Sequence, residues 1–158
     1  GADMGEFFIH RNIANLVPPY NPDGDHHGTS AAVEYALKTL QVAHIIILGH
    51  SHCGGIKSGY KLFCSNQISH ESIFVNKWLD ILKPAYENIS KNINRFDEGN
   101  NADLEKESIK FSLNNLTDFP FVKSALNKKE LVLHGLWHDI GSGALEALDP
   151  ISMNFKKI

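Results

Sequence analysis

The sequence predicts an α/β protein in which a mostly parallel central sheet is flanked by helices. Residues 45–48, Ile-Ile-Ile-Leu, form a short apolar run rich in β-branched side chains, which is typical of a fully buried strand. A helical pattern at 28–40 precedes this run, and a strand-like run, Glu-Phe-Phe-Ile at 6–9, precedes the helix. A β–loop–α–β succession of this length favours a parallel pair of strands with a right-handed crossover.

Size and composition indicate a globular chain with an ordinary core. The 158 residues are expected to form a single domain, with a net charge of −3 and 42% hydrophobic residues. Acidic and basic residues are interspersed, which argues against a nucleic-acid partner, and no apolar stretch is long enough to span a membrane. Two cysteines do not make a disulfide framework, so we expect a reducing, cytoplasmic setting.

The remaining elements follow from apolar periodicity and from turn residues. Thr29 or Ser30 is expected to cap the helix at 28–40. Further helices are expected at 56–62, 73–95, 102–116 and after Asp118, which we expect to cap the last of them. Pro84 should kink or split the second of these helices. A strand at 130–140, a turn at 141–143 and an antiparallel return at 144–148 complete the pattern, and the tail from 149 is expected to be peripheral.

The turn after the apolar strand carries the candidate chemistry. In open α/β sheets, ligands bind just beyond the carboxyl ends of the strands, and His50 and Cys53 lie there. Neutral imidazole and thiolate are both zinc ligands. Gly54 and Gly55 allow a sharp turn without obstructing side chains, and a helix beginning after Cys53 would favour its thiolate. We therefore interpret His50 and Cys53 as candidate zinc ligands.

Two ligands do not complete a zinc site, and other interpretations stay open. Zinc needs at least three protein ligands, and Cys64 is a poor third candidate because a helix is expected between it and Cys53. A buried cysteine beside a turn histidine is the commoner explanation of such a pair. Cys53 as a nucleophile is a further alternative, but Lys57 is the only cation in the loop and no general base can be identified.

Three blocks of sequence, taken together, resemble the β-class carbonic anhydrases. They are Gly-Glu-Phe-Phe-Ile-His-Arg-Asn-Ile-Ala-Asn-Leu-Val-Pro-Pro at 5–19, Gly-Thr-Ser-Ala-Ala-Val-Glu-Tyr-Ala at 28–36 and Leu-Gly-His-Ser-His-Cys-Gly-Gly-Ile at 48–56. Their order and spacing match the family, and the late Leu-His-Gly at 133–135 extends the resemblance along the chain.

The resemblance implies a zinc enzyme that reversibly hydrates carbon dioxide to bicarbonate and a proton. The family's His-x-x-Cys zinc ligands fall on His50 and Cys53. The substrate cleft is implied to include Phe8, Ile13 and Tyr35, together with the backbone amide of Gly54. The implied fold pairs into homodimers or homotetramers around a mostly parallel sheet.

One family motif does not occur in the sequence. Cys-x-Asp-x-Arg supplies the remaining zinc cysteine and an Asp–Arg pair that gates the fourth zinc position, and in the family it precedes the first block. No catalytic residue of that pair can therefore be assigned to this chain. We expect an N-terminal segment of the protein to be missing from these 158 residues. The alternative is a catalytically inactive fragment or scaffold with an incomplete zinc site.

Overall fold

The computed structural model describes residues 3–24, 27–65, 72–90 and 101–158. Its elements run from the amino to the carboxyl end as η1 Ile13–Asn15, α1 Gly28–Lys38, β1 His44–His50, α2 Gly54–Ser65, α3 Ile73–Leu79, η2 Asp80–Leu82, α4 Lys83–Ser90, α5 Ala102–Thr117, α6 Pro120–Asn127, β2 Val132–His138, β3 Leu145–Leu148 and β4 Phe155–Lys157. Among the helices of these described ranges, none is long and apolar enough to cross a bilayer.

The described strands form one sheet in the order β1-β2-β3-β4. β1 and β2 are parallel, with His44 opposite Val132 and His50 opposite His138. β3 pairs antiparallel with β2, and β4 with β3. The α/β class is confirmed. Across the described residues the sheet is mixed: β1 and β2 form a parallel pair, and the hairpin from β2 to β3 extends the sheet.

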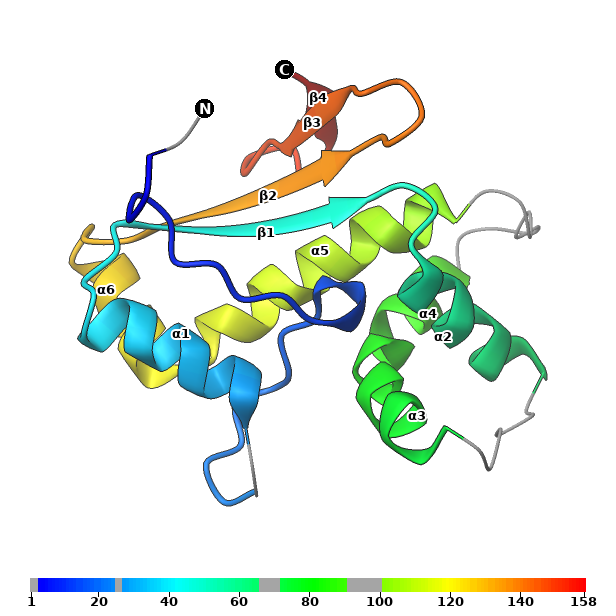
Figure 1. Ribbon diagram of the computed structural model, residues 1–158, viewed down its shortest axis with the longest axis horizontal. Helices are drawn as coiled ribbons and strands as arrows, with labels where there is room; N and C mark the ends of the chain where they lie inside the picture. The colour runs from blue at the N-terminus through cyan, green and yellow to red at the C-terminus, as the bar shows by residue number, and fades with distance from the viewer. Residues whose placement is uncertain (1–2, 25–26, 66–71, 91–100) are drawn as a thin grey trace.

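Helix α5 lies along one face of the β1–β2 pair, and α1 and α6 lie on the same side of the sheet (Figure 1). Two glycines allow this close packing. A Cβ on Gly49 would come within 2.8 Å of the Ile109 side chain, and one on Gly135 within 2.9 Å of it. Ile109 is fully buried, so α5 packs directly against one face of the two strands. Residues of α5 therefore lie close to the carboxyl ends of these strands.

The prediction of a strand at 6–9 is wrong, because this run belongs to no strand of the structure. The chain that follows it is held by polar side chains of α5. Ser112 donates from its hydroxyl to the carbonyl of Asn15 at 3.0 Å, and Asn115 donates from its amide to the carbonyl of Val17 at 2.8 Å. Val17 donates its own backbone N–H to the Ser112 hydroxyl at 3.1 Å. The segment is therefore tied to a helix through side chains, which an alternating strand pattern does not reveal.

The sequence located the helices well and their caps poorly. Pro84 splits its region as expected, since α4 begins at Lys83 with the proline in its first turn. Thr29 lies inside α1, where its hydroxyl accepts from Asn12, and does not cap the helix. Asp118 follows α5, and Phe119 occupies the N-cap of α6. The expected helix over 91–95 lies outside the described residues.

The carboxyl-terminal tail is mostly exposed, as expected of a peripheral segment, and it also adds β4 at the edge of the sheet beyond β3. The hairpin between β2 and β3 is confirmed, with Leu136 opposite Ala147. Asp149 closes the turn that leads to β4 by accepting from the backbone N–H groups of Ile151 and Ser152, both at 2.9 Å. Together β3 and β4 extend the sheet away from the β1 edge.

Candidate metal centre

The loop at 50–54 leaves the carboxyl end of β1 and leads directly into α2. The parallel pairing continues one step past the strand, because Ser51 donates its backbone N–H to the carbonyl of His138 at 2.8 Å. α2 begins at Gly54, two residues earlier than the sequence predicts, so Cys53 stands immediately before the helix. The loop therefore sets His50 at a strand end and Cys53 at a helix start.

His50 is oriented by a hydrogen bond within the loop. Its Nδ1 lies 2.9 Å from the carbonyl oxygen of Ser51. A carbonyl only accepts, so Nδ1 carries the proton in this contact, and the lone pair of Nε2 is left for another partner. Zinc-ligating histidines commonly use this arrangement, in which one ring nitrogen donates to a carbonyl while the other binds the metal. His50 therefore has the tautomer that a zinc ligand requires.

Cys53 is a free cysteine with only 6% of its surface exposed. Its carbonyl accepts the backbone N–H of Lys57 at 3.0 Å, which starts the hydrogen bonding of α2. The positive end of the α2 dipole is thus adjacent to the cysteine and favours the thiolate form, which is the form that binds zinc. Cys53 therefore lies buried at the amino end of α2.

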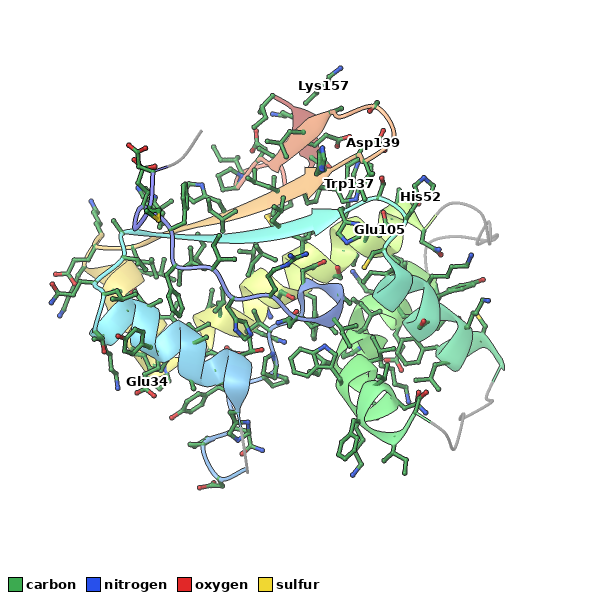
Figure 2. All side chains as sticks on the ribbon, viewed as in Figure 1. Glu34, His52, Glu105, Trp137, Asp139 and Lys157 are labelled. Atoms are coloured by element: carbon green, nitrogen blue, oxygen red, sulfur yellow. The ribbon has the colours of Figure 1, made fainter. Side chains whose placement is uncertain are left out.

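Glu105 of α5 holds the backbone of Cys53 in place. It was not identified from the sequence. This α5 residue is 2% exposed and accepts the backbone N–H of Cys53 at 3.0 Å through Oε1. Its Oε2 accepts from the indole N–H of Trp137 at 3.2 Å. Figure 2 shows Glu105 and Trp137 close to the carboxyl ends of β1 and β2. One buried carboxylate therefore joins the loop, α5 and β2.

A second carboxylate, Asp139, fixes the loop from the β2 side. Its carboxylate accepts from the hydroxyls of Ser142 and Ser51 and from the backbone N–H of Gly141. These hydrogen bonds, that from Ser142 foremost, lower the pKa of Asp139 to about 2. The Ser51 hydroxyl in turn accepts the backbone N–H of Ile140 at 2.8 Å. The residue next to His50 is thus held by an ionised side chain.

The two candidate ligands fit zinc as part of a set. Across the described residues, no three His, Cys, Asp or Glu side chains are grouped so as to hold a metal ion. Cys64 lies near the far end of α2, where its sulfur is 3.4 Å from the Tyr86 hydroxyl. The donor chemistry and the tautomer of His50 suit zinc, and further donors are needed to complete the coordination.

The residues implied for a substrate cleft lie in two places, one at the Phe8 and Tyr35 rings and one at the start of α2. The rings of Phe8 and Tyr35 contact each other, with centroids 5.8 Å apart, and both side chains are about half exposed. Ile13 packs against the first turn of α2, since its Cγ2 would lie 2.7 Å from a Cβ on Gly55. A Cβ on Gly54 would meet nothing within 4 Å. Ile13 and the open side of Gly54 therefore lie at the same end of α2.

The chain is similar to known proteins along most of its length. A family model described as carbonic anhydrase matches residues 1–145. Beta carbonic anhydrase 3 of Arabidopsis thaliana is 37% identical over 144 residues, which is 90% of this chain and 55% of the relative. The chain therefore spans about half the length of this curated relative.

Solved structures show the same likeness. The β-carbonic anhydrase CcaA is 31% identical and superposes with a TM-score of 0.86, covering 99% of this chain and 74% of that one. A β-carbonic anhydrase described as tetrameric, from Sordaria macrospora, is 29% identical with a TM-score of 0.73, covering 92% of this chain and 70% of that one. With a family match over most of its residues, this chain belongs to the carbonic anhydrase family, in the β class.

Proposed function

We propose that this chain belongs to a zinc enzyme that reversibly hydrates carbon dioxide to bicarbonate and a proton. The observation that carries the proposal is the loop after β1, where His50 presents the Nε2 lone pair and Cys53 stands at the start of α2. Family membership supports the same reaction.

His50 and Cys53 would hold the metal, and zinc bound in this way supplies a water that ionises near neutral pH. The pKa of that water is about 7 in the carbonic anhydrase with three histidine ligands, and the value belongs to that enzyme rather than to this chain. Zinc at this loop would need at least one further protein donor. In the family this is the cysteine of the Cys-x-Asp-x-Arg motif, which the sequence does not contain.

The chain's own residues would orient and shield the reaction. The hydrogen bonds from His50 to the Ser51 carbonyl and from the Cys53 amide to Glu105 fix both ligands before any metal binds. Phe8, Ile13 and Tyr35 would offer an apolar wall to carbon dioxide, and the Gly54 amide would donate to an oxygen of bicarbonate. Gly54 is exposed and a Cβ on it would meet nothing within 4 Å, which leaves room for bicarbonate beside it.

We further propose a homodimer or homotetramer in the cytoplasm. Apolar side chains near the amino end are strongly exposed, with Phe7 at 60% and Ile9 at 74%, and a second copy would cover them. Cys53 and Cys64 are both free thiols, which suits a reducing compartment. Sedimentation equilibrium of the purified protein tests the association, and a monomer at all concentrations would contradict it.

The test of the activity combines stopped-flow carbon dioxide hydration with zinc quantification on the same samples. We expect Cys53→Ser to lose both zinc and hydration activity, because the thiolate is removed from the site. Cys64→Ser is the matched control and should retain both, since Cys64 lies away from the loop.

Other results would point to the alternatives. Full zinc occupancy without hydration would identify a scaffold with an inactive site. Activity that survives zinc removal but not thiol alkylation would identify Cys53 as a nucleophile.

A further inference from the structure

Two histidines lie side by side on the sheet, far from the loop that carries His50 and Cys53. His44 begins β1, and His134 lies on β2 opposite Ile46, so the two imidazoles are diagonal neighbours on the same face. Nδ1 of His44 is 3.1 Å from Nε2 of His134, and the ring centroids are 5.2 Å apart. His44 is six residues before His50 on β1, which places it about 20 Å along the strand from the loop.

The separation of the two nitrogens matches that of two ligands on one metal ion. Imidazole nitrogens bind zinc at about 2.0–2.1 Å. Two such bonds that end on nitrogens 3.1 Å apart enclose an angle of about 95–100° at the metal, by the triangle of those three distances. This angle lies between the right angle of square-planar or octahedral sites and the tetrahedral angle. The two rings, which face each other in the hydrogen bond, would have to turn about their side-chain torsions for both lone pairs to point to one ion.

The scaffold holds the pair in register. β1 and β2 are hydrogen-bonded from His44–Val132 to His50–His138, so the two Cα positions are fixed by a continuous ladder. His44 is exposed and His134 partly exposed, which leaves room for water to complete the coordination. Rigid placement on strands reduces the entropy that two independent ligands would lose on chelation.

The proton balance also permits metal binding. Without a metal, one ring donates N–H to the lone pair of the other, and each neutral ring carries one proton. With a metal between them, both facing nitrogens must offer lone pairs. The donor ring then moves its proton to its outer nitrogen by exchange with water, so two neutral rings bind the ion without a net loss of protons. Protonation of either ring blocks the site, because imidazolium has no lone pair to give.

We propose that His44 and His134 form a second metal site, which binds a divalent transition metal ion of the kind that imidazole favours, such as Ni²⁺, Zn²⁺ or Cu²⁺. The site uses two protein nitrogens and water, and it does not depend on the reaction proposed above. It lies on the face of the β1–β2 pair that carries Ile46, opposite the face on which α5 packs.

Ni²⁺ titration of the purified protein, followed by calorimetry and by the histidine ring resonances in NMR, tests this site. The two rings should be broadened together at substoichiometric Ni²⁺. His44→Gln and His134→Gln should each weaken this binding about a hundredfold, because each converts a chelate into a single ligand. Ni²⁺ binding should also weaken at acid pH, since neutral imidazole is the ligand form.

Two controls separate this site from others. His10→Gln removes a histidine that contacts Thr29, and it should leave the Ni²⁺ affinity unchanged. Cys53→Ser removes a ligand of the other proposed site and should leave the joint broadening of the His44 and His134 rings as it is in the wild type, so failure of the zinc enzyme proposal and failure of this one are distinguishable. The proposal is overturned if either His44→Gln or His134→Gln binds Ni²⁺ as tightly as the wild type, or if the two rings in the wild type do not respond together.

Discussion

Replacing Glu105 by glutamine tests the claim that one buried carboxylate organises the metal loop. In the wild type, its two oxygens accept from the Cys53 amide and the Trp137 indole. Glutamine has one oxygen and one NH₂ group, so one of these donors would face another donor. A buried donor without an acceptor costs roughly 1–3 kcal/mol, and Glu105 is only 2% exposed. We expect Glu105→Gln to lower the free energy of unfolding by about that amount.

Urea denaturation followed by Trp fluorescence and by circular dichroism measures this change. Glu34→Gln is the matched control, because Glu34 makes only an exposed ion pair with Lys38 on α1 and its loss should cost within about 0.5 kcal/mol. Zinc content should fall in Glu105→Gln and not in Glu34→Gln, since only the first disturbs the Cys53 amide. Equal unfolding free energies for Glu105→Gln and the wild type would refute the reasoning.

Two further predictions concern the same loop. Gly55→Ala should destabilise the fold by roughly 1–3 kcal/mol, because its Cβ would lie 2.7 Å from Ile13 Cγ2 and 3.1 Å from the backbone nitrogen of Ala14. Gly28→Ala is the control and should not destabilise the fold, since a Cβ on Gly28 would meet nothing within 4 Å. Thermal unfolding of the two variants measures the difference. The Asp139 carboxyl should titrate near pH 2 in ¹³C NMR of the folded protein. Since its pKa is lower when folded than the unfolded value of 3.8, the unfolded state binds more protons, so its stabilising effect should be complete above about pH 5 and lost as the pH falls toward 2. Asp139→Asn should remove that part of the acid sensitivity, and an unchanged pH profile would contradict the assignment.

The sequence predicted the parts of the fold that depend on local pattern. The apolar run at 45–48 located β1, and Pro84 located a helix boundary. Its failures come from contacts between distant segments. The run at 6–9 has strand-forming residues, but a strand exists only when another strand pairs with it, and no pairing with this run appears in the described sheet. The strand in the tail, β4, likewise exists only because it pairs with the edge of β3, and the sequence did not predict that pairing.

The candidate site also has a part that local sequence pattern indicates and a part that depends on a distant segment. His50 and Cys53 could be proposed as ligands because both lie in one short loop whose position follows from the strand before it. Glu105 was missed because acidic residues are common in the first turn of a helix and favour its dipole. A signal was present, since Glu105, Ser108 and Ser112 share helical spacing with the buried Ile109 and Leu116. Three polar residues on an apolar helical face indicate buried hydrogen bonds, and α5 uses them to hold both Cys53 and the chain after Ile13.

The pairing of β1 with β2 also bears on how this chain folds. Residues 90 positions apart in sequence, such as His44 and His134, are neighbours in the finished sheet. Closing so long a loop loses chain entropy before the contacts between the strands can offset that loss. Proteins rich in such long-range contacts therefore fold slowly. We expect α5 and its neighbouring helices to collapse first and the strands to join late, which makes the loop at 50–54 one of the last regions to acquire its shape.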